Sequence, residues 1–127
     1  MDNSLASFVE YEYRSSERYR RYMSLVMLRV PGEGTSFNAL AGDLVRTSDK
    51  VFGANGTVAI LMGETPLTAV KAAVTRFATR CVEAGGLQCG AAGFPQDASN
   101  AADFLSTAFR RYEIAKKEGS YAFVWSG

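Results

Sequence analysis

The sequence predicts a single layered α/β domain (α+β in its layering), in which a central sheet of about five strands is flanked by helices. Short apolar runs typical of buried strands alternate along the chain with segments whose apolar residues recur every three or four positions, as in amphipathic helices. Two of the apolar runs meet at Asn55-Gly56, and both residue types tolerate positive φ, so this pair predicts a tight β-hairpin. No repeat, linker or low-complexity segment divides residues 1–127, which are therefore expected to form one domain.

The first part of the chain predicts a helix, a strand and a second helix. The first helix runs from Ser4 to about Tyr22. One face of this helix carries a largely aromatic stripe, which is expected to pack either on the domain or on a partner and consists of Phe8, Tyr11, Ser15, Tyr19 and Tyr22. The apolar run from Ser24 to Val30 suits a strand that is buried on both faces. Thr35 or Ser36 then caps a second helix. The apolar positions of that helix are Phe37, Leu40, Ala41 and Leu44.

The middle of the chain predicts the hairpin and a long helix. The hairpin strands are expected around Lys50–Ala54 and Thr57–Met62. Thr65 is a suitable helix cap, and Pro66 suits the first helical position. The buried stripe of this helix consists of Leu67, Val70, Val74, Phe77 and Cys81. Gly85-Gly86 is expected to close it.

The last part of the chain predicts a strand, a helix and a final strand. Leu87–Ala92 forms the strand and Gly93–Asp97 a loop. Ser99 or Asn100 caps the helix. Its apolar positions are Phe104, Leu105, Ala108, Tyr112 and Ala115. Tyr121–Trp125 supplies the final strand.

Composition excludes several classes of function. Fourteen basic and thirteen acidic residues give a net charge of +1, so no overall field attracts nucleic acid or a membrane. The absence of histidine excludes imidazole-based catalysis, the usual nucleophilic triads and His-ligated zinc. Cys81 and Cys89 lack a Cys-x-x-Cys spacing, so two buried reduced thiols are expected, with a disulfide or redox role as the alternative. No secretion signal or membrane-length apolar stretch is evident, so a cytoplasmic protein is expected.

Three segments of the chain share their order and residue types with a known family: Arg18–Leu28, Arg46-Thr47-Ser48-Asp49 and Gly93–Gly119. They resemble parts of the GGDEF domains of bacterial diguanylate cyclases. The first is similar to the family's N-terminal helix and first strand, and the second to its product-binding inhibitory motif, Arg-x-x-Asp. The third is similar to its closing segment, in which a Pro-containing loop precedes a helix that ends in Ala-Lys-x-x-Gly. The resemblance extends over nearly the whole chain and implies a central sheet of the GGDEF and nucleotide-cyclase type.

The hairpin tip departs from the family's pattern. The family has Gly-Gly-Asp/Glu-Glu-Phe there, with glycines that let the backbone approach the nucleotide and acidic residues that support magnesium and catalysis. The corresponding residues here are Ala54, Asn55, Gly56, Thr57 and Val58. None of them is a carboxylate, and the Mg²⁺ ions on a triphosphate require negatively charged oxygen ligands.

The segment after the first strand departs as well. The family places a metal-binding aspartate and a nucleotide-binding helix there, whereas this chain has Arg29 near the position of the aspartate. Only the segment from Val30 to Val45 lies between the first strand and Arg46, and this length is enough for a turn and one helix. The resemblance and its departures together imply a catalytically inactive, degenerate relative with no catalytic residue, no metal site and no cofactor.

The resemblance also implies a ligand. The inhibitory site of such domains holds cyclic dimeric guanosine monophosphate (cyclic di-GMP). An arginine can bind guanine O6 and N7 or a phosphate with two donors, and an aspartate accepts from guanine N–H groups. Arg46 and Asp49 have these residue types, and Arg76 lies where the family has a second arginine. The predicted function is a cyclic di-GMP receptor that uses Arg46, Asp49 and Arg76 and signals through a protein partner or a homodimer.

These residues also have explanations that involve no ligand. Arg46 suits a helix C-terminus, Asp49 can shape the following turn, and Arg76 can be an ordinary solvated residue. The alternative function is an interaction or dimerisation module that keeps only the fold, binds no nucleotide and uses its aromatic N-terminal helix. Arg110-Arg111 is expected on a solvated helix face.

Overall fold

The central feature of the fold is a five-stranded mixed sheet. The computed structural model describes residues 3–29, 44–54, 56–81, 85–119 and 121–127. The strands are β1 (Met23–Arg29), β2 (Lys50–Ala54), β3 (Thr57–Gly63), β4 (Leu87–Phe94) and β5 (Tyr121–Val124). Their order in the sheet is β2-β3-β1-β4-β5. Among the described strands, only β4 and β5 pair in parallel, while β1 pairs antiparallel with both β3 and β4. The predicted layered fold with about five strands is confirmed.

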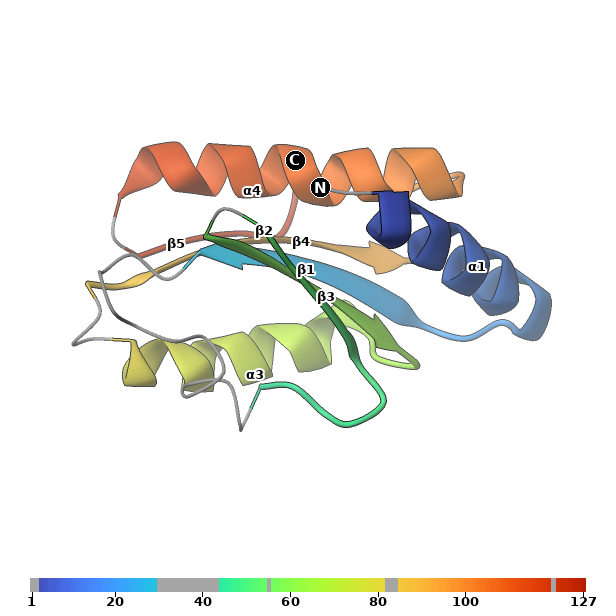
Figure 1. Cartoon of the computed structure of the whole chain (residues 1–127), viewed down its shortest axis with the longest axis horizontal. Helices are drawn as coiled ribbons and strands as arrows, with labels where there is room; N and C mark the ends of the chain where they lie inside the picture. The colour runs from blue at the N-terminus through green and yellow to red at the C-terminus, as the bar shows by residue number, and fades with distance from the viewer. Residues whose placement is uncertain (1–2, 30–43, 55, 82–84, 120) are drawn as a thin grey trace.

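The described helices cover both faces of the sheet. α1 (Asn3–Tyr19) and α4 (Ala101–Glu118) lie on one face, and α3 (Leu67–Arg80) lies on the other (Figure 1). Successive side chains of the central strand β1 pack in two different cores. Val26 and Leu28 pack on the α3 side, whereas Leu25 and Met27 pack on the α1 and α4 side. All four side chains are fully buried, so the prediction of a strand buried on both faces is confirmed.

β2 and β3 form the predicted hairpin. Their pairing ends with Ala54 opposite Thr57. Gly56 has a φ of +82°, a left-handed conformation that glycine adopts without a Cβ clash. Asn55 lies outside the described residues. The hydroxyl oxygens of Thr57 and Tyr112 are 2.7 Å apart, so a hydrogen bond joins this end of β3 to α4.

The first helix differs from the prediction in length and in the face that it buries. α1 ends at Tyr19 rather than near Tyr22. The aromatic stripe was predicted to pack either on the domain or on a partner, and packing on the domain is wrong, because most of its members are exposed and Tyr11 is 71% exposed. The buried positions are Leu5, Val9, Tyr13 and Ser16. This second stripe has the same helical spacing. Its aliphatic side chains lose no hydrogen bond with water on burial, and the buried Tyr13 hydroxyl donates instead to the Ala98 carbonyl oxygen at 3.2 Å.

The stripes predicted for the two long helices are confirmed. In α3 every predicted position is buried, and in α4 only Leu105 remains partly exposed. Asn100 caps α4, because its side-chain oxygen accepts the Asp103 N–H at 2.8 Å. α3 begins one residue later than predicted, with Pro66 as its N-cap. β4 is also longer than predicted and includes the first two residues of the expected loop.

The second predicted helix, after Thr35 or Ser36, lies almost entirely outside the described residues. Its last predicted apolar residue, Leu44, is described and is buried in the core on the α3 side. Within the described ranges, no helix combines the length and the apolar character needed to cross a membrane.

Candidate functional site

Arg46 and Asp49 form a closed turn immediately before β2. The Asp49 N–H donates to the Arg46 carbonyl oxygen at 3.0 Å, and Asp49 Oδ2 accepts the Arg46 N–H at 2.8 Å. An aspartate that accepts a nearby backbone N–H in this way stabilises a turn. The Asp49 side chain is 0% exposed, so its carboxylate is part of the protein interior.

The guanidinium of Arg46 is held through a single nitrogen. Nη2 donates to Asp49 Oδ1 and to the Gly63 carbonyl oxygen, both at 3.4 Å, and also to the Thr65 hydroxyl. The Thr65 hydroxyl donates to the Gly63 carbonyl at 2.9 Å, and the Thr65 carbonyl accepts from Ser24 Oγ at 2.8 Å. This chain of hydrogen bonds fixes the guanidinium beside the connection between β3 and α3.

The other side of the Arg46 guanidinium is accessible. The side chain is 57% exposed, and no hydrogen-bond partner for Nε or Nη1 is found among the described residues. The remaining N–H donors of the planar group are therefore available to a ligand. A partly exposed ion pair such as Arg46–Asp49 contributes only about 0–1 kcal/mol to stability, so its main effect here is to orient the arginine.

Arg76 lies on the exposed side of α3. It follows Leu67, the first residue of the helix, by nine positions, which corresponds to about 14 Å along the helix axis. Within the described part of the chain, no hydrogen bond or ion pair joins Arg76 to Arg46 or Asp49. The structure thus brings Arg46 and Asp49 together and leaves Arg76 as a separate surface cation.

The hairpin tip lies at the same edge of the sheet as the end of β1. Val58 pairs with Leu28, which immediately precedes the exposed Arg29. The described tip residues have no ionisable side chain. Arg29 therefore brings a positive charge to this end of the strands, and the described tip residues bring no charge of either sign. Among the described residues, no group of three or more Asp, Glu, Cys or His side chains is arranged to hold a metal ion.

A buried ion pair beside α4 was missed by the sequence prediction. Arg111 was expected in solvent but is only 5% exposed. Its guanidinium contacts both carboxylate oxygens of Asp97, each at 3.1 Å, and donates to the Ala91 carbonyl at 2.8 Å. Asp97 also accepts the Gly93 N–H at 2.8 Å. The sequence did contain a signal for the burial of Arg111. The residue lies seven positions after the buried Phe104 and therefore on the buried stripe of α4.

The two cysteines are buried free thiols, as predicted. Burial raises the pKa of both thiols, and for Cys81 the nearby Arg80 partly opposes this rise. Cys81 Sγ donates to the Phe77 carbonyl oxygen at 3.5 Å. Because a thiol is reactive only as the thiolate, neither side chain is suited to nucleophilic or redox chemistry in this fold.

Comparison with known proteins identifies the fold. No protein-family model matches the sequence, and no curated protein shows detectable similarity to it. The structure is similar to the FimX GGDEF domain of Pseudomonas aeruginosa, with a TM-score of 0.73, 17% identity and coverage of 94% of this chain and 91% of that domain. It is also similar to the active GGEEF domain of a diguanylate cyclase from Vibrio cholerae, with a TM-score of 0.68, 12% identity and coverage of 98% and 96%.

A third similar structure is that of a microbial GGDEF domain whose interaction with cyclic di-GMP was described. The TM-score is 0.71, the identity 13% and the coverage 97% of this chain and 91% of that chain. These likenesses extend over nearly the whole chain at low sequence identity, so the chain has the GGDEF fold and the predicted resemblance is confirmed at that level.

Proposed function

We propose that this GGDEF-fold domain is a receptor for cyclic di-GMP rather than a cyclase, and that Arg46 and Arg76 contact the ligand while Asp49 holds Arg46 in place. The observation that supports the proposal is the state of Arg46. Its guanidinium is fixed at Nη2, and its other donors are accessible. A side chain that is already ordered loses less conformational entropy when it binds a ligand.

The chemistry of the ligand matches this arrangement. Cyclic di-GMP presents guanine edges and two phosphodiester groups, and a planar guanidinium can bind either of them with two parallel hydrogen bonds. The net charge of the chain is only +1, so an anionic ligand must be held by local cations. Arg76 is the second exposed arginine of the proposed site.

The buried state of Asp49 changes the role that we assign to it. The carboxylate already accepts from the Arg46 N–H and from Arg46 Nη2, and its side chain is not exposed. In this arrangement it does not reach a guanine. We therefore treat Asp49 as a positioning residue, which acts on the ligand through Arg46.

The proposal that the domain is not a cyclase rests on residue types. The tip residues contain no carboxylate, and Arg29 stands near the position where the family has a metal-binding aspartate. Incubation with guanosine triphosphate and Mg²⁺ should yield no cyclic di-GMP above a protein-free blank. Turnover that scales with protein concentration would show that other residues supply the metal ligands.

The receptor proposal is tested by calorimetric titration of cyclic di-GMP into the wild type, Arg46→Ala and Lys71→Ala. Lys71 serves as the control, because it is another exposed cation and, like Arg76, lies on α3. We expect Arg46→Ala to bind about thirtyfold more weakly, which corresponds to about 2 kcal/mol, and Lys71→Ala to bind as the wild type does. If the wild type gives no heat and no thermal shift at saturating ligand, the receptor proposal is wrong.

A second candidate function is a protein-interaction module that binds no nucleotide. The observation that favours it is the group of exposed aromatic side chains in α1 and directly after it, which includes Tyr11, Tyr19 and Tyr22. Tyrosine supplies large contact area at low entropic cost and is enriched at protein interfaces. This function predicts no response to cyclic di-GMP and self-association that Tyr11→Ser abolishes in sedimentation velocity.

A further inference from the structure

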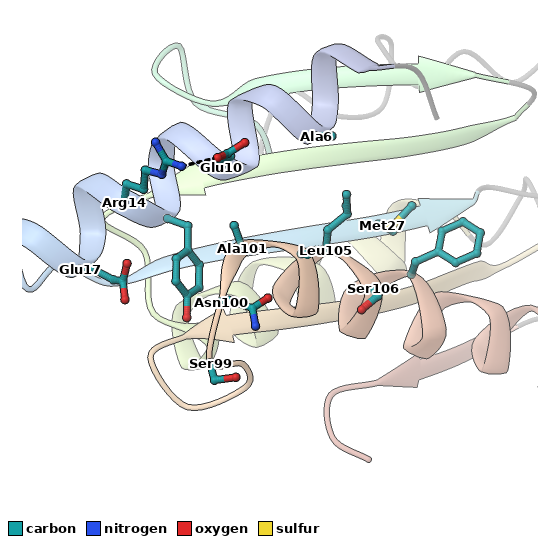
Figure 2. A pocket seen from close by; sticks show the side chains of 13 residues that line it. Ala6, Glu10, Arg14, Glu17, Met27, Ser99, Asn100, Ala101, Leu105 and Ser106 are labelled. Atoms are coloured by element: carbon teal, nitrogen blue, oxygen red, sulfur yellow. Dashed lines mark hydrogen bonds and ion pairs between the residues drawn. The ribbon is translucent and has the colours of Figure 1, made fainter.

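A groove runs between α1 and α4, on the face of the sheet opposite α3 (Figure 2). We call it the α1–α4 groove. Its volume is about 780 Å³. Met27 of β1 lies at its floor, Ala6 lines the α1 wall, and Leu105 and Phe109 line the α4 wall. Phe109 is 45% exposed, so the groove presents a large uncovered aromatic side chain beside an apolar floor. Such a surface is typical of a binding groove.

The length of the groove suits a short helix. The α1 wall extends from Ala6 to Glu17, about 17 Å along the helix axis, and the α4 wall from Ala101 to Phe109, about 12 Å. These lengths correspond to roughly two to three turns of a helix lying against both walls. Figure 2 shows Leu105 rising from α4 into the space between the two helices.

The walls also favour a helical occupant over an extended one. Both walls are α-helices, whose backbone N–H and C=O groups are already paired within the helix. An extended peptide would find no backbone partners on the side that faces the groove, whereas a helix pairs its own backbone groups. An amphipathic helix whose apolar face lies in a groove is a recurrent mode of recognition.

The two ends of the groove differ in charge. The charged lining residues are Glu10, Arg14 and Glu17, and Glu10 and Arg14 form an ion pair at 2.6 Å. No ion pair joins Glu17 to another described residue. Burial raises the pKa of Tyr13, and the negative charges of Glu17 and Asp103 raise it further, so this end of the groove has two carboxylates near the Tyr13 hydroxyl. It therefore favours a cation, although the chain as a whole is slightly basic.

We propose that the α1–α4 groove binds an amphipathic helix of a partner protein, with apolar side chains against Leu105 and Phe109 and a lysine or arginine beside Glu17. Because Glu17 lies at one end of the groove, the lysine or arginine of the partner helix should lie about two helical turns from the apolar side chains that contact Leu105 and Phe109. The proposal goes beyond the receptor function. The groove lies on the opposite face of the sheet from α3, and its peptide test needs no nucleotide, so either proposal can fail without the other.

The test uses two synthetic helical peptides of about 16 residues, long enough to cover the groove. Both have leucines on one face, and the other positions are lysine in one peptide and glutamate in the other. Each peptide is titrated into the isotopically labelled full chain and followed by nuclear magnetic resonance. We expect the lysine peptide to bind at least about tenfold more tightly, with shifts confined to α1, α4 and β1.

Two variants with matched controls locate the site. Phe109→Ser should weaken binding of the lysine peptide about tenfold or more, whereas Ile114→Ser should change it by less than about twofold. Ile114 is a fair control because it is also on α4, outside the groove lining, and 39% exposed. Glu17→Lys should remove the preference for the lysine peptide, and Glu118→Lys, at the far end of α4, should keep it.

Three outcomes would overturn the proposal. The first is failure of both peptides to bind at millimolar concentration, and the second is equal binding of the two peptides. The third is a wild-type dimer in sedimentation velocity that Phe109→Ser converts to a monomer, because the occupant of the groove would then be a second copy of this chain. Circular dichroism of each variant establishes that the fold is intact.

Discussion

The two faces of the sheet present different kinds of surface. On the α3 side, Arg46 is held in one orientation by Asp49 and Thr65, which suits a small charged ligand that needs defined hydrogen-bond geometry. On the α1 and α4 side, the groove is mostly apolar, its Glu10 and Arg14 side chains pair with each other, and Glu17 lies at one end. Such a surface suits a macromolecular segment recognised by shape and by one charge. The two proposed sites are independent of each other, because they lie on opposite faces of the sheet and each face has its own core.

The largest expected effect concerns how the face with the groove is held together. Arg111→Ala should lower the free energy of unfolding by about 3–5 kcal/mol, because it leaves the buried carboxylate of Asp97 without its cation. Lys117→Ala, an exposed cation on the same helix, should change it by less than about 0.5 kcal/mol. Urea denaturation measures both values. Equal stability of the two variants would mean that the Arg111–Asp97 pair does not hold α4 on the sheet.

The next effect distinguishes the buried face of α1 from its aromatic face. Leu5→Ala should cost about 2–4 kcal/mol, since it removes a fully buried side chain from the core shared with α4. Tyr11→Ala should cost less than about 0.5 kcal/mol, because that side chain is exposed. Thermal denaturation of the two variants compares them directly. A reversed order would restore the aromatic stripe as the packing face.

The smallest effect on stability concerns the Arg46 turn. Asp49→Ala should cost about 1–3 kcal/mol, because it leaves the backbone N–H of Arg46 without its acceptor. Arg46→Ala should cost less than about 1 kcal/mol, since it removes only a partly exposed ion pair and side-chain hydrogen bonds. Chemical denaturation at neutral pH separates the two. If Arg46→Ala proved the more costly change, the arginine would be a structural residue rather than one held for a ligand.

Local patterns predicted most of the fold. The Asn55-Gly56 pair, the apolar runs and the stripes of α3 and α4 depend on short-range spacing, and these predictions agree with the structure. The predictions that failed depend on tertiary contacts. α1 has two stripes with helical spacing, and only packing against the core decides that Leu5 and Val9 are buried while Tyr11 is not.

The candidate site shows the same division. The spacing of Arg46 and Asp49 is suited to a turn, but only the folded chain buries the Asp49 carboxylate and places the Arg46 guanidinium beside Thr65. Arg111 looked like a surface residue because its partner, Asp97, lies in a loop that precedes the helix. A sequence pattern gives residue type and spacing, whereas the surroundings of a charged group follow from the assembled fold.

The central claim is that Asp49 holds Arg46 for cyclic di-GMP, and a double-mutant cycle tests it most directly. Calorimetric affinities are compared for the wild type, Arg46→Ala, Asp49→Ala and the double variant. We predict that each single change weakens binding by about thirtyfold and that the double variant is no weaker than Arg46→Ala alone, because the two residues act as one unit. Wild-type affinity in Asp49→Ala, or additive losses in the double variant, would contradict this account.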